Sequence, residues 1–303
     1  HDVVCREIGI EAGRSVVMGT AANVNYAAMV SASDLEVEVT AVVTAGVQTN
    51  AVCGGDPAAW RETPDGTVKV PPVSGTINTM LLISAPVAPS ALARVAMTMT
   101  EGKGAALQRL AVPSCASSDL ATGTGTDQFC IASPVDGRKA LTSASPHMKF
   151  GEIVGAAVRD ATIEALRWQN GLEASMTRGL FHALGRLGVK EATILDDLAP
   201  LLPVVDLELL RRNSKSAFFE PTVAAAAFAL AAVADRGRHG TLPASVVNDA
   251  LVSQAATLAV GLAASPGRWP EFRARLHDGD VSSVRALVLR ALALGWSEKW
   301  RSS

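Results

Sequence analysis

The chain changes its hydrophobic pattern near residue 150, and this change limits the folds that it can adopt. From there, apolar side chains follow the i, i+3, i+4, i+7 spacing of one helix face: Phe150, Ile153, Val154, Ala157, Val158, Ala161, Ala165 and Leu166. This spacing predicts a long amphipathic helix with one buried face. The preceding residues are instead rich in Val, Thr and Gly, with short apolar runs between turns. We therefore expect two regions of different architecture.

Short apolar runs in the first half predict strands that alternate with helices. The expected strands are residues 37–43, 80–83, 95–99 and 129–132. Residues 89–94 and 101–110 have helical character and lie between or after these runs. Strands interleaved with helices predict an α/β (α+β) sandwich-type domain. We place this domain at residues 1–171.

The second half predicts helices without strands. The expected helices after the long one are residues 176–187, 222–236, 243–264 and 281–294. Proline and glycine residues separate them, as is typical of helix ends. We therefore expect an α-helical C-terminal extension over residues 172–303. Its most apolar runs are too short or too interrupted by polar residues for a convincing membrane span, and we interpret them as buried alanine-rich helices.

Composition excludes several classes of function. Hydrophobic residues make up 49% of the 303-residue chain and charged residues 18%, which excludes a disordered protein. The net charge of −2 and the aromatic content of 4% give no electrostatic or stacking surface for nucleic acid, and no basic surface for a membrane. We therefore expect a small-molecule partner, no nucleic acid and no membrane.

The cysteines favour a reducing location. Cys5, Cys53, Cys115 and Cys130 show no C-x-x-C spacing, which argues against a structural zinc site. Four cysteines are too few for a disulfide-stapled secreted scaffold. No signal-peptide pattern is present, so we expect free thiols and a cytoplasmic location.

Polar clusters at the ends of the expected strands are the candidate functional residues. Asn50 and Asp56 lie in a small-residue segment after the first strand, where Cys53 is the best-placed cysteine nucleophile. Asn78 leads into the next strand. Asn, Asp and Gly are also common turn residues, so ordinary turns are the alternative.

A third cluster, residues 101–107, opens the helix expected after the strand at 95–99. Glu101 is a candidate general base there, and Lys103 a candidate ligand contact. A glutamate in the first turn of a helix is also favoured by the helix dipole alone, so an exposed structural role is the alternative.

The segment Ala121–Asp127 alternates Thr and Gly before the expected strand at 129–132. It offers the Thr124 and Thr126 hydroxyls, bare backbone amides and the Asp127 carboxylate, which suit a phosphate, carboxylate or amide-rich ligand. A flexible linker is the alternative.

His147 opens the long helix and is the one histidine in the first 150 residues besides His1. A neutral imidazole can shuttle protons. We expect it to face the same strand ends as the other clusters. Lys149 and Glu152 follow it and are candidate substrate contacts.

Together and in this order, these pieces resemble the adenosylcobinamide amidohydrolase family of corrinoid salvage. The matching motifs are Thr44-Ala-Gly with Thr49-Asn50-Ala and Gly55-Asp56; Gly75-Thr-Ile-Asn78; Thr100-Glu101-x-Lys103-x-Ala105-Ala106-Leu107; Ala121-Thr-Gly-Thr-Gly-Thr-Asp127; and His147-x-Lys149-x-Gly151-Glu152-x-x-Gly155. The resemblance covers about residues 15–170 and leaves the helical region unexplained. That region would be a lid, an element for forming a homo-oligomer, or a sign that the chain acts on a different amide.

The resemblance implies hydrolysis of the amide that joins aminopropanol to the corrin ring. Amide hydrolysis needs an activated water, charge stabilisation and a proton for the leaving amine. We expect Glu101 or His147 to activate the water and the other to protonate the amine. Asp127 would orient His147 or Lys103. The residues expected to hold the substrate are Asn50, Asp56, Asn78, Lys103, Thr124, Thr126, Lys149 and Glu152.

Two other classes remain open from the sequence. One is a different amide hydrolase or acyl-transfer enzyme on the same scaffold, and the other is a non-catalytic corrinoid- or nucleotide-binding protein. In the second case Glu101 and His147 would point apart. The cofactor is open as well: Asp56, Glu101, Asp127 and His147 include the residue types that hold a divalent metal, although no spacing requires one.

Overall fold

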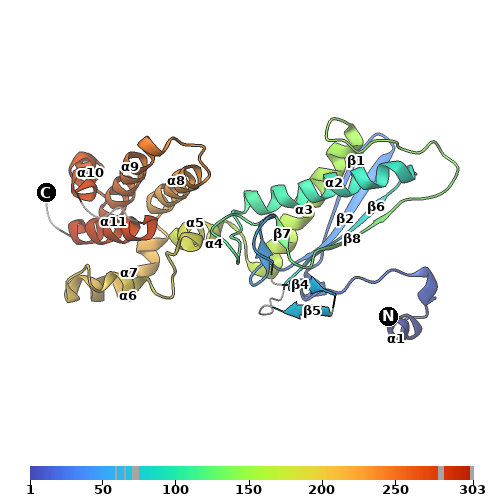
Figure 1. Ribbon diagram of the computed structural model, residues 1–303, viewed down its shortest axis with the longest axis horizontal. Coiled ribbons are helices and arrows are strands. Elements are labelled where there is room, and N and C mark those ends of the chain that lie inside the picture. Colours follow the sequence, from blue (N-terminus) through green and yellow to red (C-terminus); the bar gives the residue numbers. More distant parts are fainter. Residues whose placement is uncertain (59, 65, 70–74, 279–282, 301–303) are drawn as a thin grey trace. The chain divides into compact units, whose positions relative to one another are not determined.

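The computed structural model describes residues 1–58, 60–64, 66–69, 75–278 and 283–300 (Figure 1). The chain divides into two compact units, His1–Glu173 and Ala174–Ser303. The first holds a sheet and helices, and the described residues of the second form helices alone. The expectation of an α/β domain followed by an α-helical extension is confirmed. The division lies close to the boundary expected after residue 171.

A four-stranded sheet with the order β1-β2-β6-β8 is the frame of the first unit. The hairpin of β1 (Ala28–Asp34) and β2 (Val37–Ala45) is antiparallel, and β6 (Ile77–Ile83) runs antiparallel to β2. β8 (Gln128–Ala132) runs parallel to β6. The end of β2 and the starts of β6 and β8 therefore lie side by side, at the same end of the strands. We call this end of the sheet the β6-start edge, and it is not an edge strand.

Two long helices cover one face of this sheet (Figure 1). They are α2 (Pro89–Arg109) and α3 (Lys149–Asn170). The strands alternate in burial, so that one side of each faces the helices: in β2, Val39, Ala41 and Val43 are fully buried. Burying this face against the apolar stripes of the two helices forms the core of the unit.

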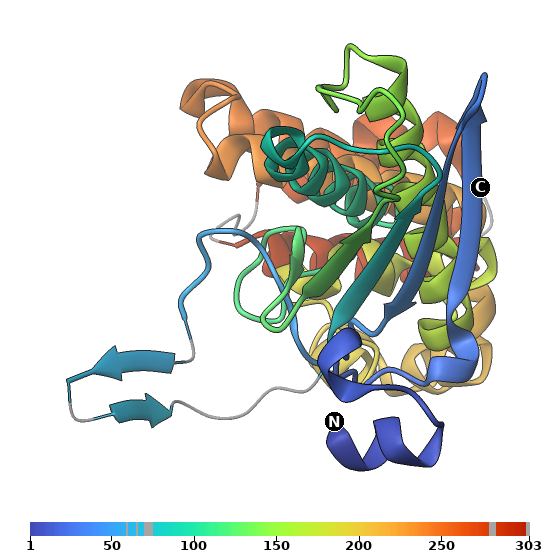
Figure 2. The same cartoon turned by 90° about the vertical axis from the view of Figure 1, so that its right-hand side faces the viewer.

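Smaller elements surround the sheet. β3 (Ala51–Val52) pairs antiparallel with β7 (Gly123–Thr124), and the two form a short ribbon. The β4–β5 hairpin (Trp60–Thr63 and Gly66–Lys69) extends away from the sheet (Figure 2). The N-terminal segment contains α1 (Asp2–Glu7) and two 3-10 turns, Ala12–Arg14 and Val24–Tyr26.

The expectation of a strand at residues 95–99 is wrong, because these residues form the middle of α2. The run Val-Ala-Met-Thr-Met has strand propensity, but the buried positions of α2 follow helical spacing: Ala91, Val95, Thr98, Met99, Gly102 and Ala106. Burial of one continuous helical face outweighs the local preference of three or four residues. Residues 89–94 and 101–110 are consequently one helix, and Glu101 lies in its interior rather than at an N-terminus.

The second unit has a hydrophobic core of its own. Its helices are α4 (Ala174–Thr177), α5 (Leu180–Leu184), α6 (Ile194–Leu198), α7 (Val204–Phe218), α8 (Pro221–Arg238), α9 (Ala244–Ala263), α10 (Trp269–His277) and α11 (Val284–Lys299), with 3-10 turns at Gly185–Leu187 and Pro266–Arg268. The helices expected at 222–236 and 243–264 correspond to α8 and α9. The helix expected from residue 281 begins outside the described residues and corresponds to α11.

Helix α9 is long and apolar enough to cross a membrane by length and composition, and α7 with α8 passes the same test as one bent pair. Half of the most apolar window of α9 is buried inside the protein. The core helix of a helical domain has the same properties.

Helices α2 and α3 pack closely where Gly102 meets Gly155, and this contact yields a stability prediction. A Cβ atom on Gly102 would lie 2.7 Å from the carbonyl oxygen of Gly155, whereas one on Gly104 would meet nothing within 4 Å. Alanine is favoured over glycine inside a helix by about 1 kcal/mol. We expect Gly104→Ala to raise the free energy of unfolding and Gly102→Ala to lower it by about 1–3 kcal/mol through overpacking. Calorimetry on both variants measures this, and equal effects would contradict the close contact.

Candidate active site

The Asp127 carboxylate joins three elements at the β6-start edge. Its Oδ1 accepts hydrogen bonds from the Ile77 amide at 3.0 Å and the Thr124 hydroxyl at 2.5 Å. Its Oδ2 accepts from the Thr124 amide at 3.1 Å and forms an ion pair with Lys103, which reaches over from α2. Because both side chains of the ion pair are largely buried, the pair is held in one geometry.

Buried polar side chains extend this cluster. The Thr76 hydroxyl donates to the Thr126 carbonyl oxygen at 2.7 Å. The Asn50 amide donates to the Gly75 carbonyl at 2.7 Å and to the Thr126 hydroxyl at 3.3 Å, and the Asn78 amide donates to the Gly19 carbonyl at 2.7 Å. These bonds connect the segments that surround the β6-start edge. We call the set the Asp127 cluster: Asn50, Thr76, Asn78, Lys103, Thr124, Thr126 and Asp127.

The Thr-Gly-Thr-Gly segment fits this cluster because glycine leaves room for the ion pair. A Cβ atom on Gly123 would lie 2.7 Å from Asp127 Oδ2 and 2.9 Å from Lys103 Nζ. The alternation of Thr and Gly is therefore the result of two requirements: hydroxyls that bond within the loop and backbone that passes close to charged atoms.

Glu101 and Lys103 line an open pocket of about 650 Å³ together with Thr124 and Asp127. Glu101 is exposed, and among the residues that the structure describes its carboxylate has no hydrogen-bond or ion-pair partner. A carboxylate with no partner can accept a proton from a water, and an ammonium group that lines the same pocket can stabilise negative charge. The sequence prediction that Glu101, Lys103 and Asp127 share one site agrees with this arrangement.

Asp56 lies at a second pocket, of about 440 Å³, which also contains Asn50, Cys53 and Thr126. Its Oδ2 accepts hydrogen bonds from the Ser114 hydroxyl at 2.6 Å and the Cys53 amide at 2.7 Å. Burial acts to raise the pKa of Asp56, but hydrogen bonds from Ser114, Ser117 and the Cys53 amide together hold this pKa below its usual value. Asp56 therefore fastens the loop after β3, next to the Asp127 cluster.

His147 does not join these residues. It precedes the N-terminus of α3, and α3 reaches the β6-start edge only at its other end, where Asn170 accepts a hydrogen bond from the Val47 amide at 3.3 Å. A helix of 22 residues is about 33 Å long. The expectation that His147 faces the same strand ends as Glu101 is therefore wrong in this chain, because the helix that it opens starts at the opposite edge of the sheet.

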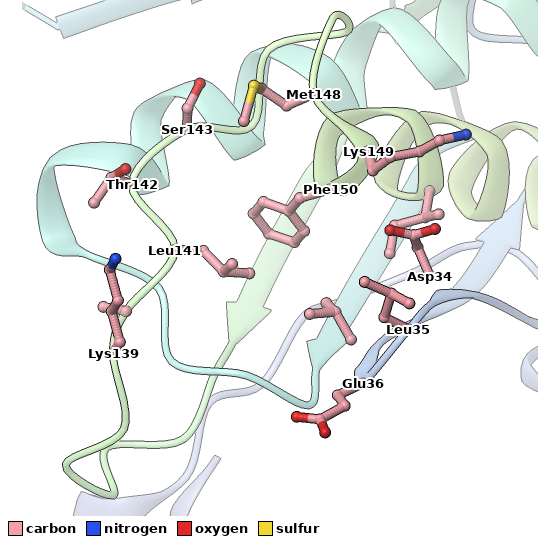
Figure 3. Close-up of a pocket in the computed structure, with 13 residues that line it drawn as sticks. Asp34, Leu35, Glu36, Lys139, Leu141, Thr142, Ser143, Met148, Lys149 and Phe150 are labelled. Carbon is pink, nitrogen blue, oxygen red and sulfur yellow. The ribbon is translucent and has the colours of Figure 1, made fainter.

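Lys149 lies at that opposite edge as well, in a separate pocket of about 630 Å³ (Figure 3). The side chains of Leu141 and Phe150 point into this pocket, and Asp34 lies near Lys149. Lys149 pairs with Glu152 at 2.8 Å on the exposed first turn of α3, and this hydrogen bond raises the pKa of Lys149. The predicted site residues are thus divided between two edges of one sheet.

Sequence reasoning missed Thr76 and Ser114 as individual residues of the site. Both hydroxyls donate within it, to the Thr126 carbonyl and the Asp56 carboxylate. Ser114 lies in a loop of small polar residues, and no spacing relates it to Asp56. Among the described residues, no group of three or more His, Cys, Asp or Glu side chains could hold a metal ion.

The fold is that of an α/β domain with a cluster of bonded polar side chains and two pockets at the β6-start edge of its sheet. The chain belongs to the adenosylcobinamide amidohydrolase family, whose model matches residues 1–174. It is 32% identical over 179 residues to an uncharacterized protein of Methanocaldococcus jannaschii. The aligned segment covers 56% of this chain and 69% of the relative. No solved structure matches the chain significantly. The helical unit lies beyond the family match.

The lowered pKa of Asp56 predicts how stability depends on pH. Since this pKa is lower in the folded than in the unfolded chain, the carboxylate stabilises the fold above about pH 4, and the gain is lost as the pH falls through the folded pKa. We expect Asp56→Asn to lower the stability of the first unit at pH 7 by about 1–2 kcal/mol. The difference from wild type should shrink below pH 3.8, the ordinary pKa.

Thermal unfolding by calorimetry at several pH values measures this difference. Asp278→Asn is the control, because the Asp278 side chain is 83% exposed. An Asp56→Asn difference that does not change with pH would contradict the assignment.

Proposed function

We propose that this chain hydrolyses the amide that joins aminopropanol to the corrin ring of adenosylcobinamide. The products are adenosylcobyric acid and 1-amino-2-propanol. The observation that carries the proposal is the family membership, combined with the meeting of four of the five family-like motifs at the β6-start edge. Such a reaction places the protein in corrinoid salvage.

The described side chains supply the groups that the reaction needs. Glu101 removes a proton from a water molecule as the water oxygen attacks the amide carbonyl carbon. The Lys103 ammonium stabilises the negative charge that develops on the carbonyl oxygen. The C–N bond then breaks, and the proton passes from Glu101 to the leaving amine. Asp127 is a positioning residue in this scheme, because its four contacts hold Lys103 and the loop.

Contacts with the rest of the substrate come from the rim of the cluster. The Thr126 side chain is exposed beside Asn50 and can bond an amide of the corrin periphery. The Asn50, Asn78 and Thr124 side chains are buried and bonded within the cluster, so they shape the site from beneath.

A non-catalytic corrinoid-binding protein is the second candidate, and one observation favours it. Glu101 and His147 lie at opposite edges of the sheet, so the two expected proton-transfer groups do not meet within one chain. In the hydrolytic scheme Glu101 performs both proton transfers, and His147 has no role. The assay below separates the two candidates.

The experiment incubates the purified chain of residues 1–303 with adenosylcobinamide. It follows aminopropanol release and the corrinoid product by mass spectrometry, with and without a chelator. We expect release by the wild type. We expect Glu101→Gln to lower kcat by about 10²- to 10⁴-fold, the usual contribution of a general base. His147→Ala should retain a kcat close to wild type.

Tight binding of the corrinoid without release would favour the binding protein and overturn the hydrolytic proposal. A large loss of kcat in His147→Ala with no loss in Glu101→Gln would reject the assignment of the base. Thermal unfolding of each variant shows whether the fold is intact.

A further inference from the structure

The turn between β1 and β2 carries an exposed leucine at a position that favours glycine. Leu35 and Glu36 form this two-residue turn, and Leu35 has a φ of 51°. Tight hairpin turns usually place Gly, Asn or Asp where φ is positive, because a larger side chain crowds the backbone there. The Leu35 side chain is also 97% exposed, so it hardly contacts its own chain. Neither the turn nor the core accounts for a leucine here, which indicates a contact outside the chain.

Two acidic side chains flank this leucine. Asp34 and Glu36 lie on either side of Leu35 (Figure 3). Within the described part of the chain, neither carboxylate has a hydrogen bond or an ion-pair contact, and Lys149 and Arg138 act on them only at longer range. We call Asp34, Leu35 and Glu36 the hairpin tip. It is apolar in the middle and acidic on both sides.

The pocket beside the hairpin tip has the complementary character. It encloses about 630 Å³, and its apolar lining includes Leu141, Phe150 and Ile153. Lys139 and Lys149 lie on opposite sides of Leu141 and Phe150 (Figure 3). Lys139 is exposed, and among the described residues its ammonium group has no ion pair. We call this cavity the Lys149 pocket. It is apolar in the middle and basic on both sides.

The hairpin tip borders the Lys149 pocket of its own chain but does not fill it, because the Leu35 side chain remains exposed to water. A surface that carries both a projection and a matching pocket is self-complementary. A two-fold axis then lets each copy insert its own projection and receive that of the other copy. Opposite charges at the rim orient such a contact, and the apolar centre supplies binding energy.

We propose that the hairpin tip of one copy enters the Lys149 pocket of a second copy, so that the chain forms a two-fold symmetric homodimer through its first unit. Leu35 then contacts the apolar lining of the other copy, and the two acidic side chains lie near its two lysines. The Lys149 pocket is at the opposite edge of the sheet from the Asp127 cluster, so the proposal does not depend on the proposed reaction. It assigns dimer formation to the α/β unit rather than to the helical extension.

The first test is sedimentation equilibrium on the chain of residues 1–303. We expect the wild type to associate to twice its mass of 31.3 kDa, with a Kd of about 1–100 µM, as a small interface gives. Leu35→Asn removes the projection, and asparagine tolerates a positive φ, so the turn should keep its shape. We expect this variant to raise Kd about tenfold or more. Leu201→Asn is the control, because Leu201 is an exposed leucine in the helical unit.

The second test reverses the charges. Asp34→Lys with Glu36→Lys makes the hairpin tip basic, and Lys139→Glu with Lys149→Glu makes the pocket rim acidic. Each double variant alone places like charges opposite each other, so we expect monomers. Equal amounts of the two variants match again in both contacts, so a heterodimer should form on mixing. This rescue requires both variants to be folded.

The outcomes are decisive for the contact. A wild type that stays monomeric at about 300 µM overturns the proposal and leaves the pocket to a different ligand. A dimer that survives Leu35→Asn but not Leu201→Asn moves the interface to the helical unit. Folded charge-reversal variants that stay monomeric when mixed reject the pairing of the hairpin tip with the Lys149 pocket. Thermal unfolding of each variant establishes that it is folded.

Discussion

The ion pair of Asp127 with Lys103 is the interaction on which the site of the first unit depends. One carboxylate receives bonds from the start of β6, from the β7 loop and from the middle of α2. Removal of either partner would leave a charge in a largely buried place, which is more costly than the net value of the pair itself. The position of the Thr-Gly-Thr-Gly loop, and with it the wall of the pocket at Glu101, follows from that pair.

Periodic patterns in the sequence predicted the parts of the fold that bury a continuous apolar face. The strand at 37–43 and the helix from Phe150 to Leu166 correspond to β2 and α3, because alternation and helical spacing are direct consequences of burial on one side. The pattern failed at residues 95–99, where a few β-favouring side chains lie inside a helix whose buried face extends well beyond them. Strand β1 was missed because its sequence, Ala-Met-Val-Ser-Ala-Ser-Asp, holds only two large apolar side chains, and one of them, Met29, is exposed.

The candidate site was predictable in composition but not in arrangement. Asn50, Asn78, Lys103, Thr124 and Asp127 meet as expected, since all of them lie near strand ends at one edge or on the helix beside it. His147 is different because its position depends on the direction of α3, and no local pattern encodes which sheet edge a helix begins from. Its motif also contains Gly155, which packs against Gly102, so part of that motif reflects the contact between α2 and α3.

The narrow passage of Gly123 past Asp127 and Lys103 affects how mutational data on this loop should be interpreted. A methyl group at this position would displace charged atoms without removing any functional group from the chain. An alanine scan would therefore give the glycine the same score as a residue that takes part in the reaction. At this glycine, a loss of activity on substitution reports the added side-chain volume. A structural position can be distinguished from a reactive one only by comparing substitutions that change side-chain volume with substitutions that change the functional group.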